Sequence, residues 1–129
     1  MRFFSRAPQS VAQLVERFVA IGTDLPEIVG PGEVRGYDKA SGAMRDIAKQ
    51  LQALGGEGEE ALLKLMGHGN PVVRMRAAAA CLNVSRDRAV NVLADICDLR
   101  AGKVSMDAMH ALLFVDEFDL ETGPKRRPV

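Results

Sequence analysis

Histidine and cysteine are the residue types with which this sequence could carry out acid–base, nucleophilic or metal chemistry. Neither His68 nor His110 is followed by a metal-ligating side chain three or four residues on, so no helical metal site is indicated. Cys81 and Cys97 lie among apolar residues at helical spacing, which predicts two buried free thiols in a reducing compartment. A catalytic or metal-binding cysteine would need partners at ligand spacing, and we expect none.

Carboxylates offer a second source of chemistry in an acidic run near the end of the chain. Paired carboxylates can act as acid and base where their environments separate their pKa values, but a solvated helix end is a commoner origin of such a run. Gly30-Pro31-Gly32 follows no strand pattern, so it is not a phosphate-binding loop. We expect no catalytic residues, no cofactor and no enzymatic activity, although an enclosed pocket joining His110 to Asp107 and Asp116 would favour an enzyme. The acidic run near the end of the chain comprises Asp116, Glu117, Asp119 and Glu121.

Arginine side chains cluster in the middle of the chain, and two interpretations of them stay open. They could form a basic ridge that contacts nucleic acid or an acidic partner. Alternatively they cover helix ends, because Asp87, Asp95 and Asp98 interrupt the ridge. We expect Arg74 and Asn70 to have structural roles. The candidate residues for contact with a partner are Arg76, Arg86 and Arg88.

The elements that must position these side chains are helices. Apolar residues recur at steps of three and four, with polar residues between them, and no strand pattern is evident. Ser10 is a good N-cap, and Asn70 followed by Pro71 is a strong helix start. The run of four alanines at 77–80 would let neighbouring helices approach closely, so this helix is expected at the centre of the fold. The six predicted helices cover about 10–22, 38–54, 57–66, 70–84, 85–101 and the residues from 105 on.

The predicted helices make a single domain over residues 1–129. A Gly- and Pro-rich loop is expected at 22–37, with Ile28 among the residues that pin it to the core, and a flexible tail at 122–129. The chain carries 17 basic and 17 acidic residues, five Phe, one Tyr and no Trp. Neutral charge and scarce aromatic residues argue against a general polyanion binder or a base-stacking surface. No signal peptide and no stretch of ~18 apolar residues is visible, so a cytoplasmic location without membrane contact is expected.

Two helix pairs resemble each other in sequence, since 60–65 aligns with 88–93 and 75–78 aligns with 109–112. The segment 70–82, which begins Asn-Pro-Val-Val-Arg and continues into the alanine run, resembles the second helix of a HEAT repeat. Residues 37–116 are similar to a bacterial family of small HEAT-like proteins of unknown function. In HEAT repeats the residues at the positions of Asn70 and Arg74 often hydrogen-bond along the stack, although an Asp usually stands where this chain has Asn70.

The resemblance implies an all-α fold, an α–α superhelix of about six helices in three antiparallel pairs. Helix-pair stacks present variable surfaces around a constant core, so we expect a non-catalytic binding module with another protein as its partner. One alternative is an immunity-type protein that neutralises a cognate bacterial toxin. The other alternative is a nucleic-acid-binding helical repeat, which the neutral charge disfavours.

Overall fold

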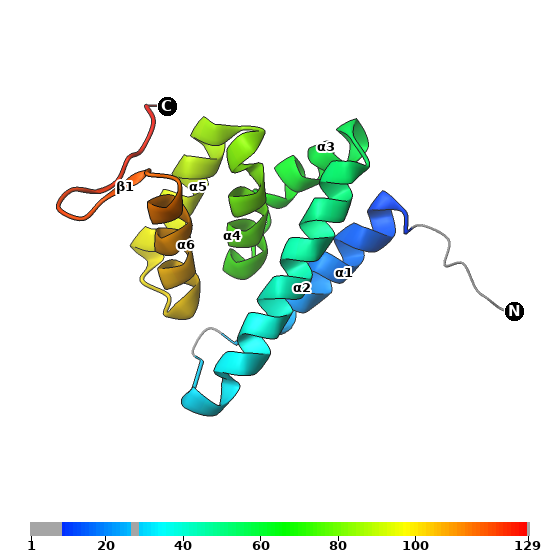
Figure 1. Cartoon of the computed structure of the whole chain (residues 1–129), viewed down its shortest axis with the longest axis horizontal. Coiled ribbons are helices and arrows are strands. Elements are labelled where there is room, and N and C mark those ends of the chain that lie inside the picture. The colour runs from blue at the N-terminus through cyan, green and yellow to red at the C-terminus, as the bar shows by residue number, and fades with distance from the viewer. Residues whose placement is uncertain (1–8, 27–28, 129) are drawn as a thin grey trace, which may run out of the picture.

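The computed structural model describes residues 9–26 and 29–128, which are mostly helical (Figure 1). The expected all-α class with six helices is confirmed in this part of the chain. Two short 3-10 helices and a small β-hairpin, which had not been predicted, complete the structure. The elements are α1 (Val11–Asp24), η1 (Pro31–Glu33), α2 (Val34–Ala53), α3 (Gly56–Leu65), α4 (Pro71–Ala80), η2 (Cys81–Asn83), α5 (Arg86–Leu99), α6 (Lys103–Phe114), β1 (Phe118–Asp119) and β2 (Gly123–Pro124).

Polar side chains start two of the helices as predicted. Ser10 and Gln13 form a capping box at the start of α1, each side chain accepting a hydrogen bond from the other residue's backbone N–H. The Asn70 side chain accepts hydrogen bonds from two backbone N–H groups in the first turn of α4. Ser105, in contrast, starts no helix, because α6 begins two residues earlier at Lys103.

The predicted loop at 22–37 is too long at both ends. α1 continues to Asp24 and α2 begins at Val34. Gly22, the last residue of the predicted helix 10–22, is a buried residue inside α1, and a Cβ added there would lie 2.6 Å from Val73 Cγ2. This glycine therefore lets α1 approach α4 instead of ending α1. The expectation that Ile28 pins the loop lies outside the described residues.

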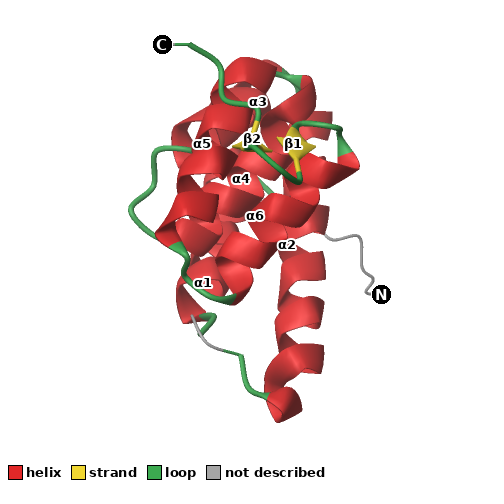
Figure 2. Cartoon of the chain, turned by 90° about the vertical axis from the view of Figure 1, so that its left-hand side faces the viewer, coloured by secondary structure: helices red, strands yellow, loops and turns green. Residues whose placement is uncertain are grey.

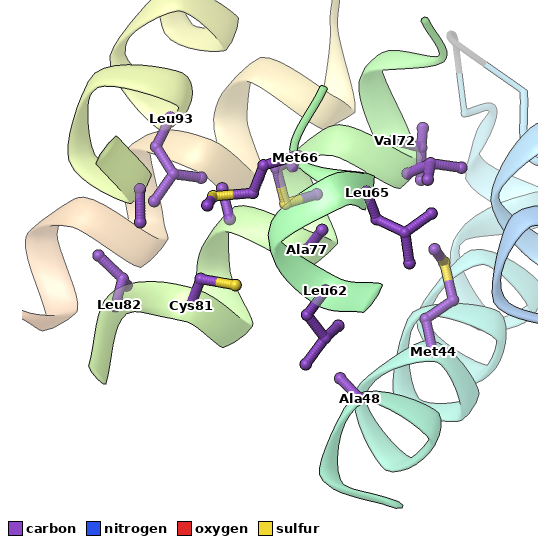
Figure 3. Packing of buried hydrophobic residues seen from close by; sticks show 14 of the residues in the cluster. Met44, Ala48, Leu62, Leu65, Met66, Val72, Ala77, Cys81, Leu82 and Leu93 are labelled. Carbon is purple, nitrogen blue, oxygen red and sulfur yellow. The ribbon is translucent and has the colours of Figure 1, made fainter. Parts of the chain in front are cut away.

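Helix α4 lies at the centre of the fold, as its alanine run predicted. It packs against all five other α-helices, with α2 and α6 on either side of it in one row (Figure 1). Ala77 and Ala78 are completely buried, whereas Ala79 and Ala80 are half-buried. Figure 3 shows Ala77 and Cys81 among leucine and methionine side chains of the core cluster. The small alanine side chains thus permit close contacts on several sides of one helix.

The C-terminal segment, predicted to be a flexible tail, folds back onto the helices instead. Phe118 pairs with Pro124 and Asp119 pairs with Gly123, forming an antiparallel hairpin against α5 and α6 (Figure 2). The Asn91 side chain of α5 both donates to the backbone carbonyl of Arg127 and accepts from its N–H group. These contacts join residues 36 positions apart, which explains why the local composition of the tail did not reveal them.

A buried carboxylate holds this segment in place. Glu117 belongs to the acidic run that was expected to be solvated, yet it is only 5% exposed. It accepts two hydrogen bonds from the Arg127 guanidinium, at 2.8 and 2.6 Å, and one from Arg86 Nε at 2.6 Å. The hydrogen bonds from Arg127 and Arg86 lower the pKa of Glu117 to about 2. Arg127 Nε also donates to Asp87 of α5.

We expect Glu117→Gln to lower the free energy of unfolding at neutral pH by about 1–3 kcal/mol, since it removes charged hydrogen bonds from a buried site. The folded-state pKa of about 2 lies below the ordinary value of 4.5. The carboxylate therefore stabilises the fold fully above pH 4.5, and this contribution is lost as pH falls from about 4.5 towards about 2. The free energy of unfolding, measured with urea, should fall less between pH 7 and pH 3 in Glu117→Gln than in the parent. The exposed Glu121→Gln is the control, and equal acid sensitivity in all three proteins would contradict the prediction.

A second glycine sets the contact between α2 and α3. Gly58 is buried in the first turn of α3, where a Cβ would lie 1.7 Å from the Leu51 carbonyl oxygen of α2. Backbone atoms cannot move aside as a flexible side chain can. Any residue larger than glycine must therefore push the two helices apart.

We expect Gly58→Ala to cost about 1–3 kcal/mol or more of stability, because it overpacks a backbone contact. Gly42 lies within α2 with no atom within 4 Å of an added Cβ. The same substitution there should stabilise the protein by about 0.5–1 kcal/mol through helix propensity. Thermal and urea unfolding of both variants give the comparison. Similar stabilities for the two variants would show that α2 and α3 do not meet as closely as described.

Candidate binding groove

Two adjoining hollows of about 370 and 810 Å³ run along the row of α2, α4 and α6. They share Arg45 of α2, Arg76 of α4, and Ala111 and Phe114 of α6. We call them together the groove. The remaining side chains that line it are Asp38, Ser41, Ala48, Lys49, Gln52, Ala79, Ala80, Leu82, Asn83, Lys103, Asp107, His110 and Val115.

One wall of the groove is a single face of α2. Tyr37, Ser41 and Arg45 are spaced four residues apart, so they lie one above the other on the helix. The first two are buried, each with 2% of its surface exposed, and Arg45 is exposed. Lys49 continues this line one turn further and is also exposed. The wall therefore changes from buried hydroxyl groups to exposed cations along the helix.

The opposite wall is a face of α6, in which Lys103, Asp107, His110 and Phe114 follow at steps of four, three and four. Asp107 is at its centre, accepting a hydrogen bond from Lys103 Nζ at 2.8 Å and one from Arg76 Nη2 at 3.0 Å. Because the Asp107 side chain is only 10% exposed, these ion pairs are better shielded from water than most surface pairs. The pair between Arg76 and Asp107 links α4 to α6, whereas Lys103 and Asp107 both belong to α6.

The aromatic ring of Tyr37 completes this charged cluster. Lys103 Nζ lies 5.3 Å from the ring centroid, within the range of a cation–π contact. Burial, and secondly the negative charge of Asp107, raise the pKa of Tyr37 to about 12. The hydroxyl is therefore protonated at neutral pH and can donate a hydrogen bond.

Three buried polar atoms beside the groove have no hydrogen-bond partner within residues 9–26 and 29–128. They are Tyr37 Oη, Ser41 Oγ and Arg76 Nε. A buried donor without a partner costs on the order of 1–3 kcal/mol, so such groups are rare in folded proteins. Their concentration at one place distinguishes this part of the groove from the rest of the structure.

The other end of the groove is more apolar. Its floor includes Ala79 and Ala80 of α4, whose methyl groups leave room above the helix. Phe114 stands at the rim with 91% of its surface exposed, the most exposed large apolar residue in the described chain. An aromatic side chain in this position adds an apolar contact surface next to the cations of α2.

The predicted partner-contact residues do not form one ridge. Arg76 lines the groove, but it is half-buried and paired with Asp107. Arg86 donates to Glu117 and to the Val115 carbonyl oxygen, so it holds the C-terminal segment. Arg88 is exposed on α5 and lines neither hollow of the groove. The structure therefore brings only one of the three to the candidate site.

The two predicted structural residues both make contacts with the turn before α4. Asn70 caps the helix, and its backbone N–H donates to His68 Nδ1 at 3.0 Å. Arg74 Nη1 donates to the backbone carbonyls of His68 and Gly69 at 3.1 and 3.5 Å. Arg74 thus stabilises the turn of its own helix pair, and the described contacts include no ladder from Arg74 to a neighbouring pair.

The residues that would have indicated an enzyme are not brought together. His110 and Asp107 both line the groove, but the Asp116 side chain is 95% exposed beside Lys125. Within the described ranges, no three His, Cys, Asp or Glu side chains gather as metal ligands. In the same ranges, no helix combines the length and the apolar composition needed to cross a membrane.

Most groove residues were missed at the sequence level, although one signal was present. Tyr37, Ser41 and Arg45 recur every four residues on a helix whose apolar stripe passes through neighbouring positions. A polar line of this kind on α2, matched by Lys103 and Asp107 on α6, suggests a shared polar face. Only the packing of both helices on α4 shows that the two faces meet.

The fold and the groove together define a class of protein, a small helical domain with a charged groove along one row of helices. Residues 12–116 match the family described as a domain of unknown function, DUF2019, and the chain belongs to this family. The match spans all six helices except Val11 and ends before the hairpin. No curated protein and no solved structure matches the chain significantly. The match agrees with the expectation of a family of unknown function, while the bacterial origin and the HEAT-like character of the family stay predictions.

The cysteines lie outside the groove. Cys81 is 1% exposed, and burial is the main cause that raises the pKa of its thiol to about 11. Cys97 is half-buried, and burial again raises its pKa. Raised thiol pKa values are the opposite of what a nucleophilic cysteine requires.

We expect both thiols of the folded protein to react slowly with a bulky disulfide reagent at pH 8, and Cys81 to react more slowly than Cys97. With a pKa of about 11, roughly a thousandth of the Cys81 thiol is ionised at that pH. Single Cys81→Ala and Cys97→Ala variants assign the two rates, and unfolding in urea gives the unprotected rate for each. Reaction of Cys81 at its unprotected rate without urea would contradict its burial.

Proposed function

We propose that the protein is a non-catalytic, HEAT-like binding module that receives a segment of another protein in the groove. The six helices follow one another as three pairs, and the second helix of each pair, α2, α4 and α6, belongs to one row. This arrangement supports the proposal of an α–α superhelix. Such stacks bind their partners through an extended surface formed by successive repeats. The described arrangement is consistent with this, because α2, α4 and α6 line the groove.

The chemistry of the groove favours an acidic segment that also carries an apolar side chain. The exposed cations Arg45 and Lys49 on α2 are the observation that supports this proposal. Charge complementarity of this kind contributes to the association rate and to the choice of partner. Next to these cations, the alanine floor of α4 and the exposed ring of Phe114 offer an apolar contact. An acidic segment with one large apolar residue would satisfy both features.

A binding role suits the groove better than catalysis. Both oxygens of the Asp107 carboxylate accept hydrogen bonds from cations, one from Arg76 and one from Lys103, so they are engaged within the protein. Asp107 also lies in the ion pair that links α4 and α6, which is a structural task. We therefore assign the groove to recognition.

Nucleic acid is the second candidate partner, because the same cations could contact phosphates. Two features weigh against it. The chain has no net charge, and Phe114 is the one phenylalanine, tyrosine or tryptophan ring among the described residues that line the groove, since the single tyrosine is buried. Single-stranded nucleic acid is bound through aromatic stacking as well as charge. A gel-shift titration at low salt tests this candidate directly.

We expect the double variant Arg45→Glu/Lys49→Glu to retain its helical circular dichroism and its stability, because both residues are exposed. The variant should lose the proteins that the parent captures from native lysate, because charge reversal opposes an acidic partner. Lys39→Glu is the matched control, since Lys39 is an exposed cation of α2 that does not line the groove. Mass spectrometry of the three captures should show proteins shared by the parent and the control but absent from the double variant. Identical captures by all three would contradict the proposal, and a gel shift lost only in the double variant would favour nucleic acid.

A further inference from the structure

We propose that Tyr37, Ser41 and Arg76 form a subsite that binds a carboxylate group of the segment received in the groove. The inference rests on the proposed function, because it assigns the part of the ligand that the polar end of the groove recognises. The observation behind it is the set of three buried polar atoms without partners, Tyr37 Oη, Ser41 Oγ and Arg76 Nε.

All three atoms can donate a hydrogen bond. The Arg76 Nε–H group can only donate, and the Tyr37 hydroxyl, protonated at neutral pH because its pKa is about 12, is the next best donor. Ser41 and Arg76 line the same hollow, and Tyr37 lies one helical turn from Ser41. Donors that lack an acceptor on two adjacent helices indicate that an acceptor from outside the chain completes the site.

The neighbouring carboxylate is already engaged. Asp107 Oδ2 accepts from Arg76 Nη2 and Asp107 Oδ1 accepts from Lys103 Nζ. Asp107 raises the pKa of Tyr37 both by its charge and as a nearby acceptor, although the distance and angle between the two groups do not make a hydrogen bond. An internal hydrogen bond from Tyr37 to Asp107 is the competing explanation, and it makes a different prediction for stability.

Charge and geometry favour a carboxylate over a phosphate group. The charged side chains that line this hollow are the cations Arg45, Arg76 and Lys103 and the carboxylates Asp38 and Asp107, which leaves one net positive charge. A singly charged carboxylate neutralises this site, whereas a phosphate dianion exceeds it. Hydroxyl and guanidinium donors bind a carboxylate oxygen through short charge-assisted hydrogen bonds.

Acetate and inorganic phosphate are the probes for this subsite. We would titrate each into the ¹⁵N-labelled parent at pH 7 and follow the Nε–H resonance of Arg76, assigned with an Arg76→Lys variant. Acetate should shift this resonance until the site is saturated, and its dissociation constant should be lower than that of phosphate. Tyr37→Phe and Ser41→Ala should each weaken acetate binding by about tenfold or more, the range expected for one lost hydrogen bond to a charged group.

The same variants separate a ligand site from an internal hydrogen bond. Without acetate, Tyr37→Phe and Ser41→Ala should melt at the same temperature as the parent or higher, because each removes an unpaired buried hydroxyl. Ser105→Ala is the control, since the buried Ser105 hydroxyl donates to the Ile96 carbonyl at 2.7 Å and accepts from Ala101 N–H at 2.8 Å. It should lower the melting temperature and leave acetate binding unchanged.

Three outcomes would overturn the subsite. They are a resonance that does not respond to acetate, phosphate binding at least as tightly as acetate, and a loss of stability in Tyr37→Phe like that in Ser105→Ala. The partner proposal fails separately. If Arg45→Glu/Lys49→Glu captures the same proteins as the parent while acetate binding depends on Tyr37 and Ser41, the subsite stands without an acidic protein partner. If capture is lost in that variant but acetate does not bind, the partner proposal stands and the subsite is wrong.

Discussion

The close packing of α4 is the constraint on which the rest of the structure depends. One ten-residue helix contacts all five others, and this is sterically feasible because Ala77 and Ala78 bring only methyl groups to those contacts. Gly22 permits the approach of α1 to α4 in the same way. Larger side chains at these points would separate the helices and leave voids elsewhere, since protein interiors are close-packed. Small residues at the centre thus determine how near the larger helices can lie.

The groove is a consequence of this packing. α2 and α6 both lie against α4, so the width of α4 separates their facing sides. Its alanines fill little of that space, which leaves a groove with a short apolar floor at Ala79 and Ala80. Arg76 is the one long side chain from this floor that reaches Asp107 on the α6 wall. Its ion pair orients the guanidinium, and the unpaired Nε belongs to this oriented group.

Long-range charge pairs hold the C-terminal end of the domain. Glu117 joins Arg86, at the start of α5, to Arg127 near the end of the chain. Arg126 pairs with Asp95 and Asp98 on the same helix. The aspartates that seemed to interrupt a basic ridge in the sequence are therefore partners of arginines from the C-terminal segment. The exposed pairs contribute little each, whereas the buried carboxylate of Glu117 requires its partners.

Local signals in the sequence determined the helices. Apolar spacing of three and four, the caps at Ser10 and Asn70, and the alanine run all act within about one helical turn, and they predicted the all-α class and the central place of α4. Tertiary structure decided the role of Gly22, the fold-back of the tail and the groove. Each depends on residues many positions apart, such as Arg76 and Asp107, which are separated by 31 positions. The residues next to Arg76 or Asp107 in the sequence do not indicate this contact, because only the packing of whole helices brings the two residues together.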